Sequence, residues 1–157
     1  GVPMGGDLTK APGGMAPTFL VAAMKDPQGG NLDRIQIVKG WLGKDGKTQE
    51  RIYDVAVSGG RKIGPDGHCK NSVGSTVDVS NATYTNTIGA AHLSAYWKDP
   101  TFDAGQHAFY YVRVIQIPSP RWTAYDQKRF GIKMAANVPM TVTDRAYTSP
   151  IWYSPAK

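Results

Sequence analysis

The hydrophobic pattern is strongest between His107 and Ile117, the longest run of β-favouring residues in the chain. Both alternating faces of this run are mostly apolar. The apolar side chains are Phe109, Tyr111, Ile115 and Ile117 on one face, and Tyr110, Val112 and Val114 on the other. A strand that is apolar on both faces is typically central in its sheet and covered on both sides. The pattern therefore predicts a central, doubly covered strand over residues 107–117, which ends at Pro118 because proline cannot donate to a β-ladder.

Arg113 is the one charge in the middle of this run. Burying a lone charge is very costly, so a cation at this position needs a partner or a route to water. We therefore expect Arg113 to have either a partner or a route to water, and we count it among the candidate contact residues.

Shorter runs of β-favouring residues predict the other strands. They cover residues 18–24, 34–41, 48–57, 76–79, 81–88, 92–97, 138–144 and 147–153. Asp45 and Gly46 lie between the second and third of these runs, and this dipeptide predicts a β-hairpin over residues 34–57. Pro150 interrupts the last run, which makes that strand edge-like.

The intervening segments complete the predicted architecture. Residues 58–75 are expected to form a long polar loop, and residues 123–128 a short helical turn. About nine short strands with little helix, and no internal repeat, predict an all-β fold, a β-sandwich of the Ig-like or jelly-roll-like kind. Residues 1–17, rich in Gly and Pro, are expected to be an extended lead-in or linker, and residues 18–157 a single β-sandwich domain.

Composition narrows the class of protein. The 157 residues are 41% hydrophobic and 19% charged, as in an ordinary globular domain. The net charge is +6, but Lys and Arg are spread along the chain with no block of four or more. This spread favours a solvated basic surface over a nucleic-acid partner. No apolar run approaches the roughly 20 residues of a membrane-spanning helix.

The usual signatures of catalysis are absent from the sequence. The three histidines, His68, His92 and His107, lack the spacing of metal ligands. No common nucleotide-binding or nucleophile motif appears. Cys69 is the only cysteine, so no internal disulfide can form. We therefore predict no catalytic residue, no metal ligand and no cofactor in this chain.

Aromatic and cationic side chains are mixed after the central strand, in the cluster Arg121, Trp122, Tyr125, Asp126, Lys128 and Arg129. Arginine donors suit carboxylates or phosphates, and loops often carry contacts. The candidate ligand- or partner-contact residues are therefore Arg113, Arg121, Trp122, Tyr125, Asp126 and Arg129. The alternative is a packed corner with a local Arg–Asp pair. The four Trp and eight Tyr of the chain offer a sugar- or base-stacking platform, with core packing as the plainer alternative.

Several segments carry a resemblance to one family. They are GVPMGGDL (1–8), FLVAAMKDP (19–27), NLDRIQIVKGW (31–41), VGSTVDV (73–79), ATYTNTIGA (82–90), FYYVRVIQIPSPRW (109–122) and RAYTSPIWYSP (145–155). They run in order through nearly the whole chain, and they resemble the C-terminal part of the DUF3604 family, bacterial proteins of unknown function.

Proteins of that family are longer, and their N-terminal part is similar to a PHP-type metallohydrolase barrel. In such barrels His, Asp and Glu hold divalent metals for the hydrolysis of phosphoesters or related bonds. None of that metal-binding part is present in these 157 residues. The resemblance implies that any divalent metal belongs to the N-terminal part of a parent protein, that this barrel is the partner, and that the parent is periplasmic or secreted.

Three functions follow as expectations. The first is a non-catalytic C-terminal β-sandwich that packs on the parent's barrel and shapes the mouth of its active site. The second is a carbohydrate- or polyanion-binding module, with a glycan or an anionic ligand as partner. The third is a small enzyme whose Asp and His residues meet only in the fold.

Overall fold

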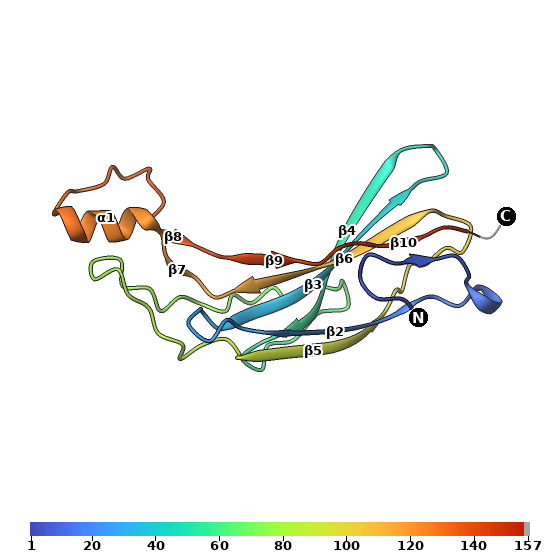
Figure 1. Ribbon diagram of the computed structural model, residues 1–157, viewed down its shortest axis with the longest axis horizontal. Helices are drawn as coiled ribbons and strands as arrows, with labels where there is room; N and C mark the ends of the chain where they lie inside the picture. Colours follow the sequence, from blue (N-terminus) through green and yellow to red (C-terminus); the bar gives the residue numbers. More distant parts are fainter. Residues whose placement is uncertain (156–157) are drawn as a thin grey trace.

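The computed structural model describes residues 1–155, which form an elongated, mostly β structure with two packed sheets (Figure 1). The larger sheet contains β1 (Asp7–Leu8), β3 (Leu32–Leu42), β4 (Thr48–Val57), β6 (Ala108–Gln116), β9 (Arg145–Tyr147) and β10 (Ile151–Tyr153). The smaller sheet pairs β2 (Thr18–Met24) with β5 (His92–Lys98). The sandwich-like, all-β fold class predicted from the sequence is confirmed.

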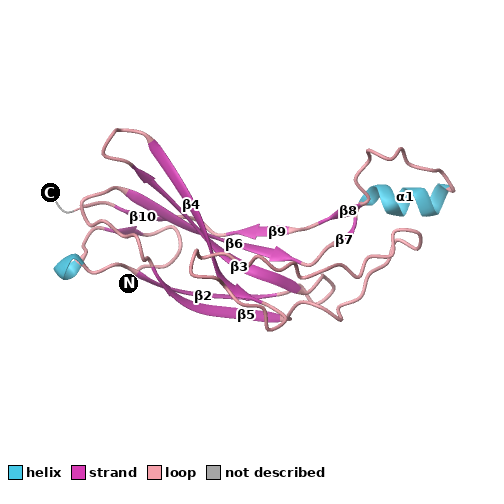
Figure 2. Ribbon diagram, turned by 180° about the vertical axis from the view of Figure 1, so that it is seen from behind, coloured by secondary structure: helices cyan, strands magenta, loops and turns pink. Residues whose placement is uncertain are grey.

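A third, very short ribbon joins β7 (Ser119–Pro120) to β8 (Thr141–Val142). It carries the single α-helix of the described residues, α1 (Trp122–Phe130), at one end of the molecule (Figure 2). A 3-10 turn, η1 (Pro12–Gly14), lies near the N-terminus, at the other end.

Strand β6 is central in the six-stranded sheet, as its sequence predicts. It pairs antiparallel with β3 on one side, and with both β10 and β9 on the other. The hairpin β3–β4 is also confirmed, with Trp41 opposite Gln49 near the turn. The predicted strands 18–24 and 48–57 coincide with β2 and β4.

The main hydrophobic cluster lies on one face of the six-stranded sheet. Buried Phe19 and Val21 of β2 pack there against Ile35, Ile37 and Tyr110. The opposite face of the sheet, called the outer face below, carries Phe109, Tyr111 and Arg113, all half-buried. The prediction that β6 is covered on both sides was therefore wrong, because the second sheet of the described residues has only two strands and packs on one side.

The predicted strands at 76–79 and 81–88 were wrong. Only one isolated bridge joins Asp78 to Thr83, and the rest of this segment is turn, bend or irregular backbone. Asp78 accepts hydrogen bonds from Ser80 Oγ at 2.6 Å and Asn81 Nδ2 at 2.7 Å. Short polar side chains of this kind satisfy the backbone locally and compete with a β-ladder, although threonine itself favours strands.

Two predicted C-terminal strands are shorter in the structure. The expected strand at 138–144 is reduced to β8, and the expected strand at 147–153 is divided into β9 and β10. Pro150 lies at the interruption, where the sequence placed it. The expected helical turn at 123–128 is the core of α1, which extends one residue earlier and two residues later.

Residues 1–17, expected to be an extended lead-in, contain β1, which pairs parallel with β10 so that Asp7 lies opposite Trp152. The Gly5 amide donates to the Pro150 carbonyl at 3.1 Å, and the Trp152 amide donates to the Gly6 carbonyl at 3.1 Å. The two ends of the described chain therefore meet in one sheet edge.

A buried ion pair connects the two sheets. Lys39 projects from β3 into the core, and its Nζ lies 2.6 Å from Oδ2 of Asp99, directly after β5. Both side chains are almost completely buried. The Tyr110 hydroxyl donates to the same carboxylate at 2.6 Å, and Lys39 Nζ also donates to the Thr101 carbonyl at 2.8 Å. These bonds satisfy the buried charges and fix β3 against the end of β5.

Lys39→Met is expected to lower the free energy of unfolding by about 3–5 kcal/mol, because it leaves the Asp99 carboxylate buried without its cation. Lys44→Met is the matched control. The Lys44 side chain is 86% exposed, and its Nζ lies as far as 4.0 Å from Oδ2 of Asp103, so this substitution should change the free energy of unfolding by less than about 0.5 kcal/mol. Urea unfolding followed by Trp fluorescence measures both. Equal, small effects would contradict an inter-sheet role for Lys39.

The same carboxylate predicts acid sensitivity. Burial alone would raise the pKa of Asp99, but hydrogen bonds from Lys39 and Tyr110 and the charge of Lys39 lower it overall. The folded pKa therefore lies below the unfolded value of about 3.9, so this stabilisation is complete above about pH 4 and is lost as pH falls through the folded pKa. Unfolding free energies measured between pH 2 and pH 7 are expected to decline in that acid window, and less steeply in Asp99→Asn.

An alkaline limit is expected as well. Burial raises the pKa of Tyr110, and the hydrogen bond to Asp99 raises it further. Above about pH 10 the unfolded chain ionises this phenol while the folded chain cannot, so stability falls as pH rises. Tyr110→Phe is expected to reduce the loss of unfolding free energy above pH 10. If this loss were unchanged in Tyr110→Phe, it would arise from other groups.

Candidate functional site

Five of the six predicted contact residues lie together in one projecting unit, the distal lobe, which we define as residues 119–142. Figure 1 shows this lobe at the end of the molecule away from β10. It is held by the β7–β8 pairing, by the Arg121 amide donating to the Met140 carbonyl at 2.9 Å, and by Thr123 Oγ1 donating to the Pro139 carbonyl at 2.6 Å. Thr123 and Ala124 are the buried side of α1.

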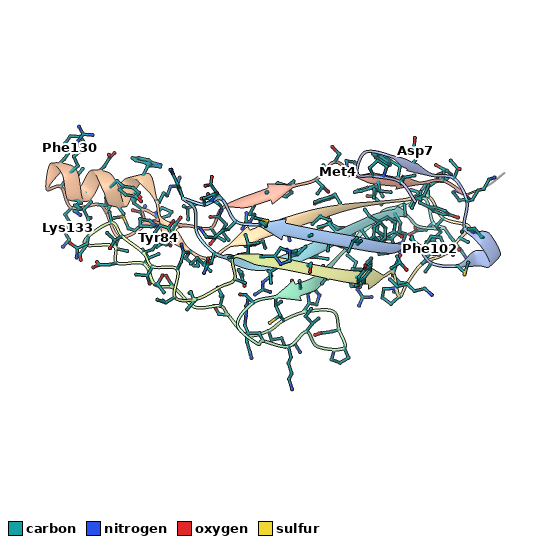
Figure 3. All side chains as sticks on the ribbon, turned by 60° about the horizontal axis from the view of Figure 1, so that its bottom comes forward. Met4, Asp7, Tyr84, Phe102, Phe130 and Lys133 are labelled. Atoms are coloured by element: carbon teal, nitrogen blue, oxygen red, sulfur yellow. The ribbon has the colours of Figure 1, made fainter. Side chains whose placement is uncertain are left out.

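The opposite side of α1 is exposed. Trp122, Tyr125 and Arg129 share this side because they lie at positions i, i+3 and i+7 of the helix. Trp122 is 61% exposed and Tyr125 is 50% exposed. Phe130, the last residue of α1, and Ile132, just beyond its end, are exposed as well. Figure 3 shows Phe130 and Lys133 at the end of the lobe, far from the two packed sheets.

The charged residues of the lobe make few bonds within the chain. Lys128 Nζ donates to the Asn81 carbonyl at 2.8 Å, which ties the lobe to the neighbouring loop. Within residues 1–155 no ion pair joins Asp126 to Arg121 or Arg129. The local Arg–Asp pair of the packed-corner alternative is therefore absent from these residues, and the exposed side of the lobe is aromatic and basic.

Arg113 lies apart from the lobe, on the outer face of the six-stranded sheet. Its Nε donates to Gln36 Oε1 at 2.8 Å, and Gln36 Nε2 donates to Asp54 Oδ1 at 2.7 Å. The other oxygen of Asp54 accepts from Arg34 at 2.9 Å and from the Cys69 amide at 2.7 Å. The expected partner of Arg113 is thus a neutral glutamine, which links it to a buried carboxylate.

Four aromatic side chains line the same outer face, and we call them the aromatic strip: Trp152, Phe109, Tyr111 and Tyr147. Phe109 lies 5.2 Å from Trp152 and 6.4 Å from Tyr111, measured between ring centroids, and Tyr111 lies 6.2 Å from Tyr147. Trp152 is 50% exposed and Tyr147 is 58% exposed. Large aromatic surface is therefore open to solvent across β6, β9 and β10.

A cleft of about 510 Å³ opens at one end of the aromatic strip. Phe109 and Trp152 form its aromatic wall, and Glu50 and His107 add polar groups. Gly40 lines the cleft as well, and a Cβ atom at this position would collide with the Phe109 ring. Glycine at this position lets the Phe109 ring lie against the backbone of β3.

A larger cavity of about 660 Å³ lies between the sheets, lined by core residues such as Ile37, Tyr110 and Val112. Met4 and Leu8 of the N-terminal segment line it as well. Its lining is mostly apolar, so it extends the core rather than collecting reactive groups.

No metal centre is apparent in the part of the chain that the structure describes. No three His, Cys, Asp or Glu side chains among residues 1–155 gather closely enough to hold an ion. Cys69 is a buried thiol whose Sγ contacts the Asn71 carbonyl at 3.5 Å. The only α-helix among these residues, α1, is too short to span a membrane.

Sequence reasoning did not single out the aromatic strip. Phe109 and Tyr111 stood out only as apolar residues of a strand expected to be covered on both sides. Tyr147 and Trp152 lie more than thirty residues later, and only the register of β9 and β10 against β6 brings them alongside. The available signal was the alternation of Phe109, Tyr111 and Arg113 on one side of β6, which is unusual for a buried face.

Comparison with known proteins adds one finding. The family model DUF3604, described as a protein of unknown function, matches residues 1–155. No curated protein and no solved structure matches the chain.

Gly40→Ala is expected to cost about 1–3 kcal/mol of stability, because the added methyl group collides with the Phe109 ring. In a Phe109→Ala background the same substitution is expected to cost little, since the colliding ring is gone. A double-mutant cycle from urea unfolding measures this coupling. Additive costs would show that Phe109 does not depend on the glycine for its place in the cleft.

Proposed function

The chain belongs to the DUF3604 family of proteins of unknown function, and from this premise we propose that it acts as an accessory, non-catalytic domain that packs against a larger catalytic domain of its parent protein. In this proposal the other domain carries out the chemistry. The β-sandwich then supplies a rigid platform rather than reactive groups.

The observation that carries this proposal is the exposure of the distal lobe. Trp122, Tyr125, Phe130 and Ile132 are each about half exposed or more, within a short stretch of chain. A monomeric protein rarely leaves several large apolar side chains exposed together without a partner. Trp, Tyr and Arg are also the residues that most often dominate protein interfaces. Arg129 shares the exposed side of α1, and its guanidinium lies 5.6 Å from the centroid of the Phe130 ring.

The partner that fits the family resemblance is a PHP-like barrel of the same parent chain. Such a barrel would hold the divalent metal, and a lobe that reaches beyond the sandwich is suited to cover part of the barrel and shape the mouth of its active site. We propose a periplasmic or secreted location for the parent on the same resemblance.

A second candidate function is a carbohydrate- or polyanion-binding module. The aromatic strip and the adjoining cleft favour it, because exposed rings that line a cleft with a few polar groups are typical of small-ligand sites. This surface is separate from the distal lobe, so one chain can carry both functions.

The lobe predicts how the 157-residue chain behaves in solution. Without the partner domain, its exposed apolar side chains are expected to cause weak self-association at high concentration. The double substitution Trp122→Ser and Phe130→Ser is expected to make the chain monomeric without changing its unfolding midpoint, because both side chains are exposed. Sedimentation velocity over a concentration series measures this. Trp152→Ser, on the aromatic strip, is the matched control and leaves self-association in place.

Two results would contradict the packing role. One is a strictly monomeric wild-type chain at the highest concentration tested. The other is hydrolysis of phosphoesters by the purified chain at enzyme-like rates, which would move the chemistry into these residues.

A further inference from the structure

We propose that the outer face of the six-stranded sheet binds an acidic oligosaccharide whose sugars carry carboxylates, with sugar rings on the aromatic strip and a carboxylate at Arg113. This inference rests on the second candidate function, the carbohydrate- or polyanion-binding module, and assigns its site and its ligand class. It does not involve the distal lobe.

The strand register arranges this face in rows. Glu50, Gly40, Phe109 and Trp152 lie opposite one another on β4, β3, β6 and β10, and they form the row at the cleft. The next row along β6 has Tyr111 opposite Val38, with Ile52 beyond it on β4.

The rows then change from apolar to cationic. Asp54, Gln36, Arg113 and Tyr147 lie opposite one another in the row after Tyr111. One row further, Arg145 lies opposite Ile115. Four residues of a strand separate Phe109 from Arg113, a length of about 13 Å, so rings near the cleft and cations further along share one surface that is long enough for linked sugar units.

Arg113 is positioned for an anion by the bonds it already makes. Only its Nε donates to the protein among residues 1–155, to Gln36 at 2.8 Å, while Gln36 is held in turn by Asp54 at 2.7 Å. This relay fixes the plane of the guanidinium and leaves both terminal nitrogens without an acceptor in the described chain. The planar fork of an arginine matches the two oxygens of a carboxylate.

The charge balance of the face favours an anion at this end. Arg113 and exposed Arg145 face outward, whereas the nearest carboxylate, Asp54, is buried and occupied by Arg34, Gln36 and the Cys69 amide. Two exposed carboxylates of the face lie in the cleft row, away from the arginines: Asp7, opposite Trp152, and Glu50, opposite Gly40. There they are placed to accept hydrogen bonds from sugar hydroxyls.

A sugar chain suits the remaining chemistry better than other anions. Pyranose rings present an apolar C–H face that stacks on aromatic rings and a rim of hydroxyls for groups such as Glu50 and His107. A purely electrostatic polyanion would gain nothing from the rings of Trp152 and Phe109. A carboxylated sugar uses both the rings and the arginine within one ligand.

The test uses the full 157-residue chain and polysaccharides immobilised in native gels: polygalacturonate as the carboxylated probe, heparin as the sulfated one, a neutral mannan, and single-stranded DNA. Selective retardation by polygalacturonate is expected, with oligogalacturonates quenching Trp fluorescence. Trp152→Ala and Arg145→Met are each expected to weaken binding about tenfold, the effect of losing one stacked ring or one charged hydrogen bond.

Arg113→Lys separates geometry from charge. It keeps the cation but loses the fork, so it is expected to weaken polygalacturonate binding about tenfold while any retention on heparin stays unchanged. Lys62→Met, on the exposed surface of the 58–75 loop, removes one positive charge elsewhere and is expected to bind normally. Thermal melts check that each variant is folded.

The possible outcomes decide the proposal. Binding to mannan that is unchanged by Arg113→Lys and Arg145→Met would overturn the acidic class of ligand. Retention on heparin or DNA that is unchanged by Trp152→Ala would overturn the sugar site. No retention on any probe would overturn both the sugar site and the acidic class of ligand. None of these results bears on packing by the distal lobe, which the self-association of the Trp122 and Phe130 variants reports separately.

Discussion

The fold depends on how one buried cation is neutralised. Lys39 enters the core from the middle of the six-stranded sheet, and Asp99 reaches it from the end of the two-stranded sheet. Such a pair adds little net stability over a well-packed apolar pair, but it is satisfied only when both partners are correctly placed. The ion pair therefore specifies how the two sheets pack on each other. Purely apolar contacts, such as those of Ile35, Ile37 and Phe19, constrain this arrangement less strictly.

Because the second layer is only two strands wide, the large sheet has two different sides. Its inner side follows the ordinary logic of a sandwich core, with Tyr110 at the centre. Its outer side combines rings with a charge that is held by a polar relay. The distal lobe adds a third surface at the end of the molecule (Figure 1), so separate parts of one small domain are free to meet different partners.

Local sequence patterns predicted the long strands correctly and missed the features that depend on contacts between residues distant in the sequence. The alternation of β2 and β4 and the Asp45-Gly46 turn were sufficient to place those elements. The Thr-rich segment 81–88 has strand propensity, but hydrogen bonds of the Asp78 and Asn86 side chains stabilise turns there instead. The backbone amide of the distant Asn31 donates to Asn86 Oδ1 at 2.7 Å. The position of Arg113 in an apolar run indicated that it needs a partner or a route to water. That Gln36 is its partner depends on the register of β3 against β6. The aromatic strip was missed for the same reason.

The parallel pairing of β1 with β10 has a consequence for synthesis of the protein. Asp7 and Leu8 are made at the start of these 157 residues, yet their hydrogen-bond partners lie at Trp152 and Tyr153. While the ribosome is still translating the rest, the early segment has no place to dock, and the sheet remains open at that edge. Domains usually fold as units during translation, and here the unit is complete only when its last strand emerges. In a nascent chain this edge of the sheet therefore stays unpaired until residues 145–153 have been translated.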